Sequence, residues 1–562
     1  MDVDTRREQL CGLLYFRYFK YRCRLENTHH SLKSCDLRQI RLFLFLFIKN
    51  SCLRFPCAPK AAKHRREKPG YPVQNKRVLR DPQRQGWQIV RFSAAETASR
   101  FLPGRIAARL RPLTERLDAV LTDNGPQASA QRSSLIAFSV RVASAAIALL
   151  SQVILARWMG EFEYGIFVLV WLTMIIIGDL ACFGLHTTII RFVPEYVQRH
   201  MFGLVRGIIR TGRIFAFTAA TLIALLGAGL LLLLKDHVAS YYLVPFILGF
   251  ICLPMITLGN MLDGIARSRT WVMMALTPSY IVRPLLVLLF MIIAHEAGLP
   301  STATIALAVS IAATWLTTAG QFLTVYRSVE KDIPAAGREQ RLGEWIKVAL
   351  PIFLVEGFFF LLINVDVLMV GHALDPEHVA IYFAATKIMA LAHFVYFAVK
   401  ASVAQRYSDL LHSGDRAEFA SFAKASVRWT FWPTLFLGVV ILLTGYPLLR
   451  LFGPAFTAGY PLLFILIIGV IARASVGPAE SLLNMSGKQN ICALLYAATL
   501  AVNVILNLVL IPRFGLTGAA ISTAIAMLME AALLSAAVSR TLHITMFILI
   551  PRDRTKTSEG TL

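Results

Sequence analysis

Twelve long apolar segments limit what this chain can fold into. They lie at residues 134–156, 163–188, 208–234, 241–262, 271–294, 302–325, 346–371, 378–403, 425–447, 460–483, 491–511 and 516–538. A helix of about 20 apolar residues spans a bilayer core, and each segment reaches that length. Hydrophobic residues make up 56% of the chain and charged residues 16%, more apolar surface than a soluble core can bury. The sequence therefore predicts an all-α polytopic membrane protein with twelve transmembrane helices.

The connections between these segments are unequally charged. If residue 134 starts in the cytoplasm, the connections on that side contain 18 Lys and Arg residues. The opposite side contains four, namely Arg157, Lys235, Arg450 and Arg513. Because basic residues are retained on the cytoplasmic face, this asymmetry places the N and C termini in the cytoplasm.

The N-terminal segment, residues 1–132, holds most of the positive charge. It has 27 Lys and Arg against 11 Asp and Glu, a net +16 of the +24 of the whole chain. The remaining excess follows from loop topology, so we expect no nucleic acid partner. The apolar run at 42–48 is too short to span a membrane. We expect a disordered basic tail or an artefact of an upstream start codon.

Two stretches repeat each other 215 positions apart, 156–167 against 371–382. Each is a short acidic loop followed by an aromatic and apolar helix start. Six helices per half is an even number, so both halves enter the membrane in the same orientation. The predicted domains are two six-helix bundles at 133–325 and 346–540, a cytoplasmic linker at 326–345, and a short interfacial stretch with a polar tail at 541–562. A cavity between such bundles opens to one side at a time.

The predicted external loops argue against an enzyme. Enzymes that act on lipid-linked sugars need acids, bases or a metal outside the hydrocarbon, and the longest external loops here have about six residues. The sequence contains no Walker loop, HExxH motif or paired-cysteine motif. We therefore expect a non-enzymatic transporter with no cofactor and no metal, driven by an ion gradient or by the gradient of its substrate.

Several motifs in order resemble one family. They are Ile154–Gly160, Arg191–Tyr196, Asp366–Gly371, Leu451–Phe456 and Leu510–Ile521. Together they resemble the polysaccharide flippase family, which is related to the multidrug and toxin extruders (MATE) within the multidrug, oligosaccharidyl-lipid and polysaccharide exporter (MOP) superfamily. The resemblance runs from about residue 133 to 540.

This resemblance implies a function in the bacterial inner membrane. The implied activity is flipping an undecaprenyl-diphosphate-linked oligosaccharide from the cytoplasmic to the periplasmic leaflet, for surface polysaccharide or lipopolysaccharide biosynthesis. The implied partners are the lipid-linked oligosaccharide, the bilayer and a polysaccharide polymerase.

Three alternatives remain open. A cation-coupled multidrug extruder of the same superfamily has the same architecture. A polysaccharide polymerase or ligase is disfavoured by the short external loops. The major facilitator type typically has a Gly-Asp-Arg-Gly-Arg-Arg-like motif between spans 2 and 3, where this chain has Arg-Phe-Val-Pro-Glu-Tyr from Arg191.

Eight ionisable residues lie well inside the predicted spans: Arg141, Asp179, Arg283, Glu356, Asp366, Lys387, Arg473 and Glu530. A diphosphate must be shielded from hydrocarbon, so we expect Arg141, Arg283, Lys387 and Arg473 to include its ligands, with Asn364 binding sugar. We expect Asp179, Asp366 and Glu356 to serve ion coupling. The alternative is that the four basic and four acidic residues form structural ion pairs. For Asn503 and Asn507, hydrogen bonding between helices is the predicted role.

Overall fold

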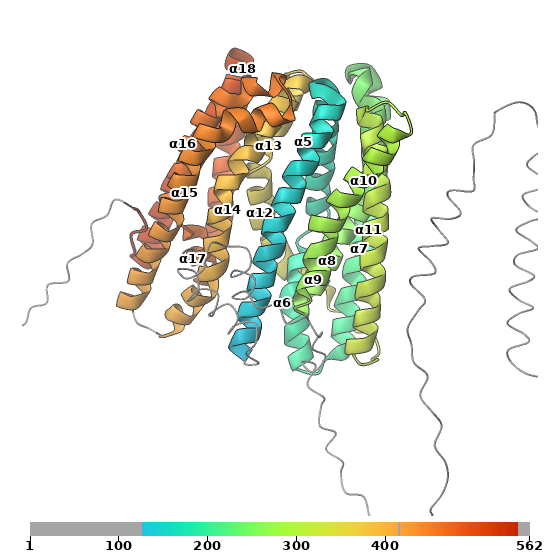
Figure 1. Ribbon diagram of the computed structural model, residues 1–562. Coiled ribbons are helices and arrows are strands. Elements are labelled where there is room, and N and C mark those ends of the chain that lie inside the picture. Colours follow the sequence, from blue (N-terminus) through green and yellow to red (C-terminus); the bar gives the residue numbers. More distant parts are fainter. Residues whose placement is uncertain (1–125, 414–415, 549–562) are drawn as a thin grey trace, which may run out of the picture. The chain divides into compact units, whose positions relative to one another are not determined.

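The computed structural model describes residues 126–413 and 416–548, and every regular element in them is helical (Figure 1). The N-terminal segment up to residue 125 and the end of the polar tail lie outside the described residues. The elements in order are α5 (Pro126–Leu180), α6 (Leu185–Gln198), α7 (Phe202–Leu233), η2 (Lys235–His237), α8 (Ser240–Ser268), α9 (Val272–Thr277), η3 (Pro278–Val282), α10 (Arg283–Glu296), α11 (Ala303–Asp332), α12 (Leu342–Leu362), α13 (Val365–Ala373), α14 (Pro376–Ser413), α15 (Arg416–Phe452), η4 (Ala455–Gly459), α16 (Tyr460–Ala474), α17 (Ala479–Met485) and α18 (Gln489–Leu542).

Ten helical stretches of the described residues are long and apolar enough to cross a membrane. The protein is therefore a multi-pass membrane protein. The longest stretch, Gln489–Leu542, has 54 residues. A straight helix of that length would measure about 80 Å, more than twice the thickness of a bilayer core.

Helices α5 and α18 are each bent back at a glycine. Gly160 in α5 has φ 74° and Gly515 in α18 has φ 57°, a backbone region that favours glycine. The hydroxyl of Tyr164 donates to Oε1 of Gln152 at 2.8 Å, although twelve residues of straight helix would separate them by about 18 Å. In α18, a Cβ at Gly518 would overlap the carbonyl of Leu510. Each helix therefore forms a hairpin, close to the predicted boundaries 156/163 and 511/516.

Four predicted spans are broken where the sequence suggested continuous helices. The segment 163–188 is interrupted by a turn at 181–184, and 346–371 breaks between α12 and α13. The segment 460–483 divides into α16 and α17 ahead of Pro478, a residue that lacks a backbone donor. In 271–294 the π-helical turn η3 separates α9 from α10. Such turns within helices are frequent at functional sites.

The predicted linker at 326–345 is mostly helical, and only residues 333–341 connect α11 to α12. Arg206 of α7 holds this connection through two hydrogen bonds of 3.0 Å to the Glu330 carboxylate and others to the carbonyls of Ile333 and Pro334. The Arg206 guanidinium thus binds the Glu330 carboxylate in the bidentate geometry typical of arginine. The connection is therefore fixed against α7.

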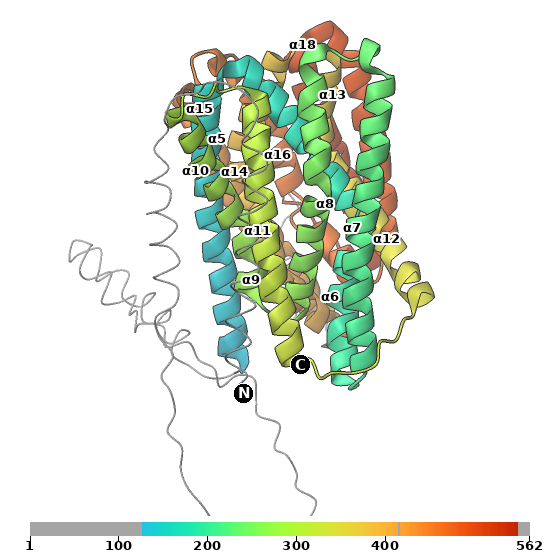
Figure 2. The ribbon, with the colours of Figure 1, turned by 90° about the vertical axis from the view of Figure 1, so that its right-hand side faces the viewer.

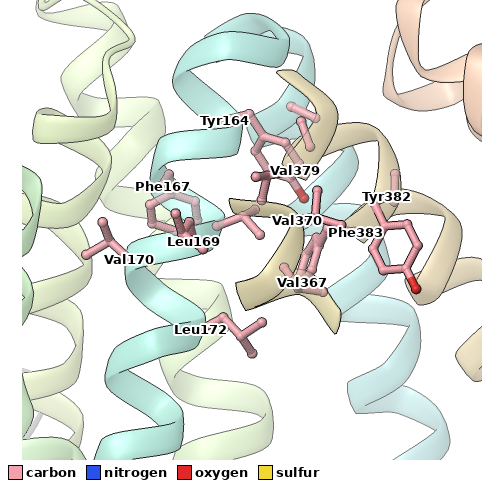
Figure 3. Packing of buried hydrophobic residues seen from close by; sticks show 14 of the residues in the cluster. Tyr164, Phe167, Leu169, Val170, Leu172, Val367, Val370, Val379, Tyr382 and Phe383 are labelled. Carbon is pink, nitrogen blue, oxygen red and sulfur yellow. The ribbon is translucent and has the colours of Figure 1, made fainter. Parts of the chain in front are cut away.

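Apolar packing joins α5 to the second half of the chain. In Figure 1, α7 and α11 lie on one side of α5, and α14–α16 lie on the other; Figure 2 shows α7, α8 and α11 from the side. The buried cluster drawn in Figure 3 places Tyr164 and Phe167 of α5 against Val370 of α13 and Val379 and Phe383 of α14. Close packing of these side chains positions the helices that carry the polar residues described below.

Candidate functional site

A cavity of about 670 Å³ opens among α6, α12, α14, α17 and α18. This volume is in the range of small-molecule binding sites. The residues that line it are Thr187, Arg191, Lys347, Val348, Pro351, Ile352, Val355, Glu356, Phe359, Lys400, Glu480, Asn484, Met485, Gln489 and Tyr496. Helix α6 comes from the first half of the chain and the other four from the second, so the cavity lies between the halves.

Five charged side chains face this cavity: Arg191, Lys347, Lys400, Glu356 and Glu480. Arg191 and Lys347 are exposed. Lys400 forms an ion pair with Glu480. Since the lining has three cations and two carboxylates, its formal charge is positive.

Arg473 does not line the cavity, but it belongs to a buried network that includes the lining residue Glu480. Its Nε donates to Glu530 at 2.6 Å, its Nη1 to the carbonyl of Gly477 at 3.0 Å, and its Nη2 to Tyr396 at 2.9 Å and Glu480 at 3.2 Å. Arg473 is 5% exposed. The carboxylates of Glu530 and Glu480 therefore already bind the Arg473 guanidinium. This is the structural ion pairing that the sequence left open as an alternative to substrate binding.

Glu356 joins α12 to α6 across the two halves. The Thr187 hydroxyl donates to both carboxylate oxygens, at 3.0 and 3.1 Å. Nε2 of His186 lies 3.5 Å from the same carboxylate. These contacts are between segments separated by about 170 residues, so they connect α6 and α12 beside the cavity.

Two further cations lie at the middle of their spans. Arg283 is eleven residues after the start of the span Val272–Glu296, and Lys387 is eleven residues after the start of Pro376–Lys400. The Arg283 guanidinium is 5.8 Å from the ring centre of Trp171, and the Lys387 ammonium is 4.5 Å from that of Phe383. Arg283 is half-buried and Lys387 is exposed. Within the described residues, neither cation has an ion pair with a carboxylate.

Asp366 on α13 forms a second buried polar group with two amides of α18. Nδ2 of Asn507 donates to Asp366 at 2.8 Å and to Oδ1 of Asn503 at 2.6 Å. The bond to Asp366 confirms the predicted role between helices for Asn507, whereas Asn503 bonds to Asn507 within α18. Nδ2 of Asn503 and Oδ1 of Asn507 are buried without a partner.

The other predicted site residues lie apart from this group. Asn364, in the turn between α12 and α13, donates to the Phe360 carbonyl of α12 at 2.9 Å. Asp179 accepts a long hydrogen bond of 3.4 Å from Asn260 on α8. The side chain of Arg141 lies outside the described side chains, although its backbone belongs to α5.

The sequence analysis did not select Glu480, Arg191 or Lys400 as site residues. Glu480 lies three residues inside a predicted span end, and the adjacent Gly477–Pro478 pair was a signal that the helix breaks there. Among the described residues, no group of three or more His, Cys, Asp or Glu side chains is placed to hold a metal ion.

The end opposite the cavity is filled by contacts between the two halves. Nε of Arg157 donates to the Leu451 carbonyl at 2.5 Å, and its Nη2 to the Arg450 carbonyl at 3.4 Å. A Cβ at Gly165 would overlap the Pro376 carbonyl. Lys400 lies 24 residues beyond Pro376 on α14, about 36 Å along the helix. The cavity and this closed end are therefore separated by a membrane's thickness.

Two family models match the chain. One is described as "Polysaccharide biosynthesis protein" and matches residues 130–404, and the other, MatE, matches 351–509. The chain is therefore similar to both families, to the first over residues 130–404 and to the second over residues 351–509. These matches agree with the family resemblance of the motifs.

A curated relative and several solved structures are also similar to this chain. An uncharacterized membrane protein of Methanocaldococcus jannaschii is 23% identical over 426 residues, 68% of this chain and 78% of the relative. An inward-facing MATE family transporter of the MOP superfamily gives a TM-score of 0.60 at 14% identity, over 70% of this chain and 96% of that one. The lipid II flippase MurJ, in an inward closed conformation, gives 0.56 at 16% identity, over 72% and 87%. At such identities the solved structures show the fold.

Proposed function

We propose that this protein flips a diphosphate-linked oligosaccharide lipid across the bacterial inner membrane, without covalent chemistry, for surface polysaccharide or lipopolysaccharide biosynthesis. The observation that carries the proposal is the pair of mid-span cations, Arg283 and Lys387, which contact aromatic rings and have no carboxylate partner among the described residues. The match to the polysaccharide biosynthesis model supports it.

The physical argument rests on the cost of charge in hydrocarbon. A cation at the centre of a bilayer costs several kcal/mol or more unless it faces water or an anion. Aromatic faces contribute about 1 to 2 kcal/mol each, which offsets part of this cost. A diphosphate that passes between Arg283 and Lys387 supplies the missing counter-charge. This argument favours an anionic substrate.

The bent helices support the proposed architecture. If the hairpins α5 and α18 each cross the membrane twice, the ten spans correspond to twelve crossings, in bundles at 133–325 and 346–540. The closed end at Arg157 is then periplasmic, and the cavity lined by Arg191 and Lys347 is cytoplasmic, in agreement with the positive-inside rule. Transport proceeds as the bundles open alternately to each side.

The remaining residues have proposed roles of two kinds. Asp366 is the best candidate for ion coupling, because its carboxylate is buried beside two amides that have unused polar atoms. Asp179 and Glu356 stay candidates for the same role. Arg141, Arg473 and Asn364 stay candidate substrate ligands, with Arg473 restricted by its two carboxylate partners. A polysaccharide polymerase is the proposed protein partner.

The test removes the two mid-span charges. We expect Arg283→Gln and Lys387→Gln each to reduce surface polysaccharide by at least tenfold, and the double variant to abolish it, because the diphosphate loses its counter-charges. Lys235→Gln, at an exposed loop, is the matched control and should export normally. Polysaccharide is measured on intact cells, with membrane levels of each variant measured in parallel. Normal export by the double variant would sink the assignment.

The rival function is a cation-coupled multidrug extruder, which the MatE match supports equally. Cationic drugs are repelled by unpaired Arg283 and Lys387, so the two functions predict opposite charge preferences. Proteoliposomes separate them: a flippase moves a fluorescent polyprenyl-diphosphate sugar, and an extruder moves a cationic dye. The extruder would be favoured if the protein transports the dye and not the lipid, and if Arg283→Gln and Lys387→Gln increase dye transport.

A further inference from the structure

The cavity between α6 and α12 contains a carboxylate enclosed by donors. Glu480 is 1% exposed and accepts hydrogen bonds from Lys400, from Tyr496 and, at 3.2 Å, from Nη2 of Arg473. Two cations and a hydroxyl therefore surround one carboxylate. Such a set of donors is an anion-binding site, and the Glu480 carboxylate occupies it. Arg473 has a second carboxylate, Glu530, at 2.6 Å. It therefore keeps a counter-charge if Glu480 moves away.

Helix α17, which carries Glu480, is bounded by turns at both ends. It has seven residues, Ala479–Met485, between Gly477 with φ 58° and Gly487 with φ 72°. Neither α16 nor α18 continues through these glycines. The left-handed glycine turns interrupt the helix on both sides of α17, while Leu482 and Leu483 pack in a buried cluster, so a rotation of α17 would hinge at Gly477 and Gly487 and carry these side chains with it. Such a rotation withdraws the carboxylate from Lys400.

Two more basic side chains line the cavity. Arg191 of α6 and Lys347 of α12 line it with exposed side chains. With Glu480 withdrawn, Arg191, Lys347 and Lys400 face the cavity and only Glu356 opposes them. A volume of about 670 Å³ accommodates a phosphate or diphosphate group together with water.

We propose that this cavity is a second anion site, in which a phosphate or diphosphate group replaces Glu480 as the partner of Lys400. It is separate from the mid-span pair, because Lys400 lies 13 residues, about 20 Å, beyond Lys387 on α14. The shared chemistry is a phosphate group with two or more negative charges, carried on a lipid or free in solution. Binding is coupled to the position of α17, and by linkage a displaced α17 binds the anion more tightly.

The experiment uses inorganic pyrophosphate and the purified full chain in detergent. The Arg283→Gln/Lys387→Gln double variant serves as background, so that binding at the mid-span cations does not contribute. In isothermal titration calorimetry we expect pyrophosphate to bind, and affinity to fall at least tenfold on adding Arg191→Gln and Lys347→Gln. Lys488→Gln is the matched control, since Lys488 is an exposed cation between α17 and α18 that does not line the cavity.

Glu480→Gln gives an effect of the opposite sign. Removing the competing carboxylate should tighten pyrophosphate binding about fivefold, whereas a merely structural Glu480 would give no gain. Lys400→Gln should weaken binding and covers the case in which Glu480→Gln does not fold. The proposal is overturned if the background variant binds no pyrophosphate, or if Arg191→Gln with Lys347→Gln leaves the affinity unchanged.

A second arm identifies the source of the phosphate group. The same variants are reconstituted in nanodiscs of phosphatidylcholine with or without phosphatidic acid. Loss of pyrophosphate binding in phosphatidic acid nanodiscs supports a lipid headgroup as the occupant. Unchanged pyrophosphate binding supports a soluble phosphate. These results do not depend on oligosaccharide transport, so failure of this proposal and failure of the flippase proposal are distinguishable.

Discussion

The two ends of the helix array are held together by different kinds of contact. At the closed end, backbone meets backbone at Gly165 and Pro376, and the ring of Tyr164 lies 6.4 Å from that of Phe383 and 6.0 Å from that of Phe456. At the cavity end, α6 and α12 are joined by polar side chains around about 670 Å³ of space, beside a buried apolar cluster in which Trp345 and Ala349 of α12 pack with α6. Apolar interdigitation excludes water, whereas water can replace polar side-chain contacts.

The difference in contacts indicates how strongly each end resists opening. Separating the closed end exposes buried apolar surface, at about 25 cal/mol for each Å². Around the cavity, opening exchanges the Thr187–Glu356 hydrogen bonds for water at a net cost near 1 kcal/mol each, and separating Trp345 from α6 exposes further apolar surface. The polar contacts around the cavity are therefore the ones that water replaces most easily, and the cavity end is the side from which a ligand enters.

The largest expected effect comes from forcing the closed end apart. Gly165→Leu places a side chain where even a Cβ overlaps the Pro376 carbonyl, and we expect it to destabilise the closed end by about 3 kcal/mol or more. The reporter is Val379→Cys, buried at this end, in a chain whose eight native cysteines are replaced by alanine. Its reaction with an impermeant thiol reagent should accelerate at least a hundredfold.

Gly229→Leu is the matched control for this change. A Cβ at Gly229 meets no atom within 4 Å, so the reporter should react as in the parent. Equal acceleration by both substitutions would show that any large side chain loosens the helices. The contrast between the ends would then lose its packing basis.

A smaller effect is expected at Arg157, whose guanidinium binds the last carbonyls of α15. Helix C-terminal carbonyls carry partial negative charge, so Arg157→Ala should weaken the closed end by about 1 kcal/mol and speed the Val379→Cys reaction about fivefold. Arg157→Lys keeps the charge but lacks the second hydrogen bond of the guanidinium, so its reaction rate should lie between those of the parent and Arg157→Ala. Arg513→Ala, at an exposed arginine, is the control. A reaction rate unchanged by Arg157→Ala would show that this contact does not help to hold the closed end together.

Much of the fold followed from the sequence, because apolar length alone defines a membrane span. Hairpin bends at Gly160 and Gly515 fell at predicted boundaries. The breaks at 181–184 and 475–478 did not, since an apolar run has the same composition on both sides of a break. The ion-pair partners could not be predicted from the sequence either. The sequence placed Arg473 and Glu530 inside spans, but only the packing of the helices brings Nε of Arg473 to 2.6 Å from the Glu530 carboxylate.

The smallest effect is expected at the cavity end, where it tests whether polar contacts there are replaceable by water. Thr187→Val keeps the side-chain shape and removes both hydrogen bonds to Glu356, so we expect a loss of about 0.5 to 1 kcal/mol. A Val355→Cys reporter in the cavity wall should react two- to fourfold faster. Thr221→Val is the control, because that hydroxyl bonds only its own helix, at the Phe217 carbonyl. A change as large as that from Gly165→Leu would mean that the cavity end also holds this conformation closed, and the two ends would then differ in contact chemistry without differing in resistance to opening.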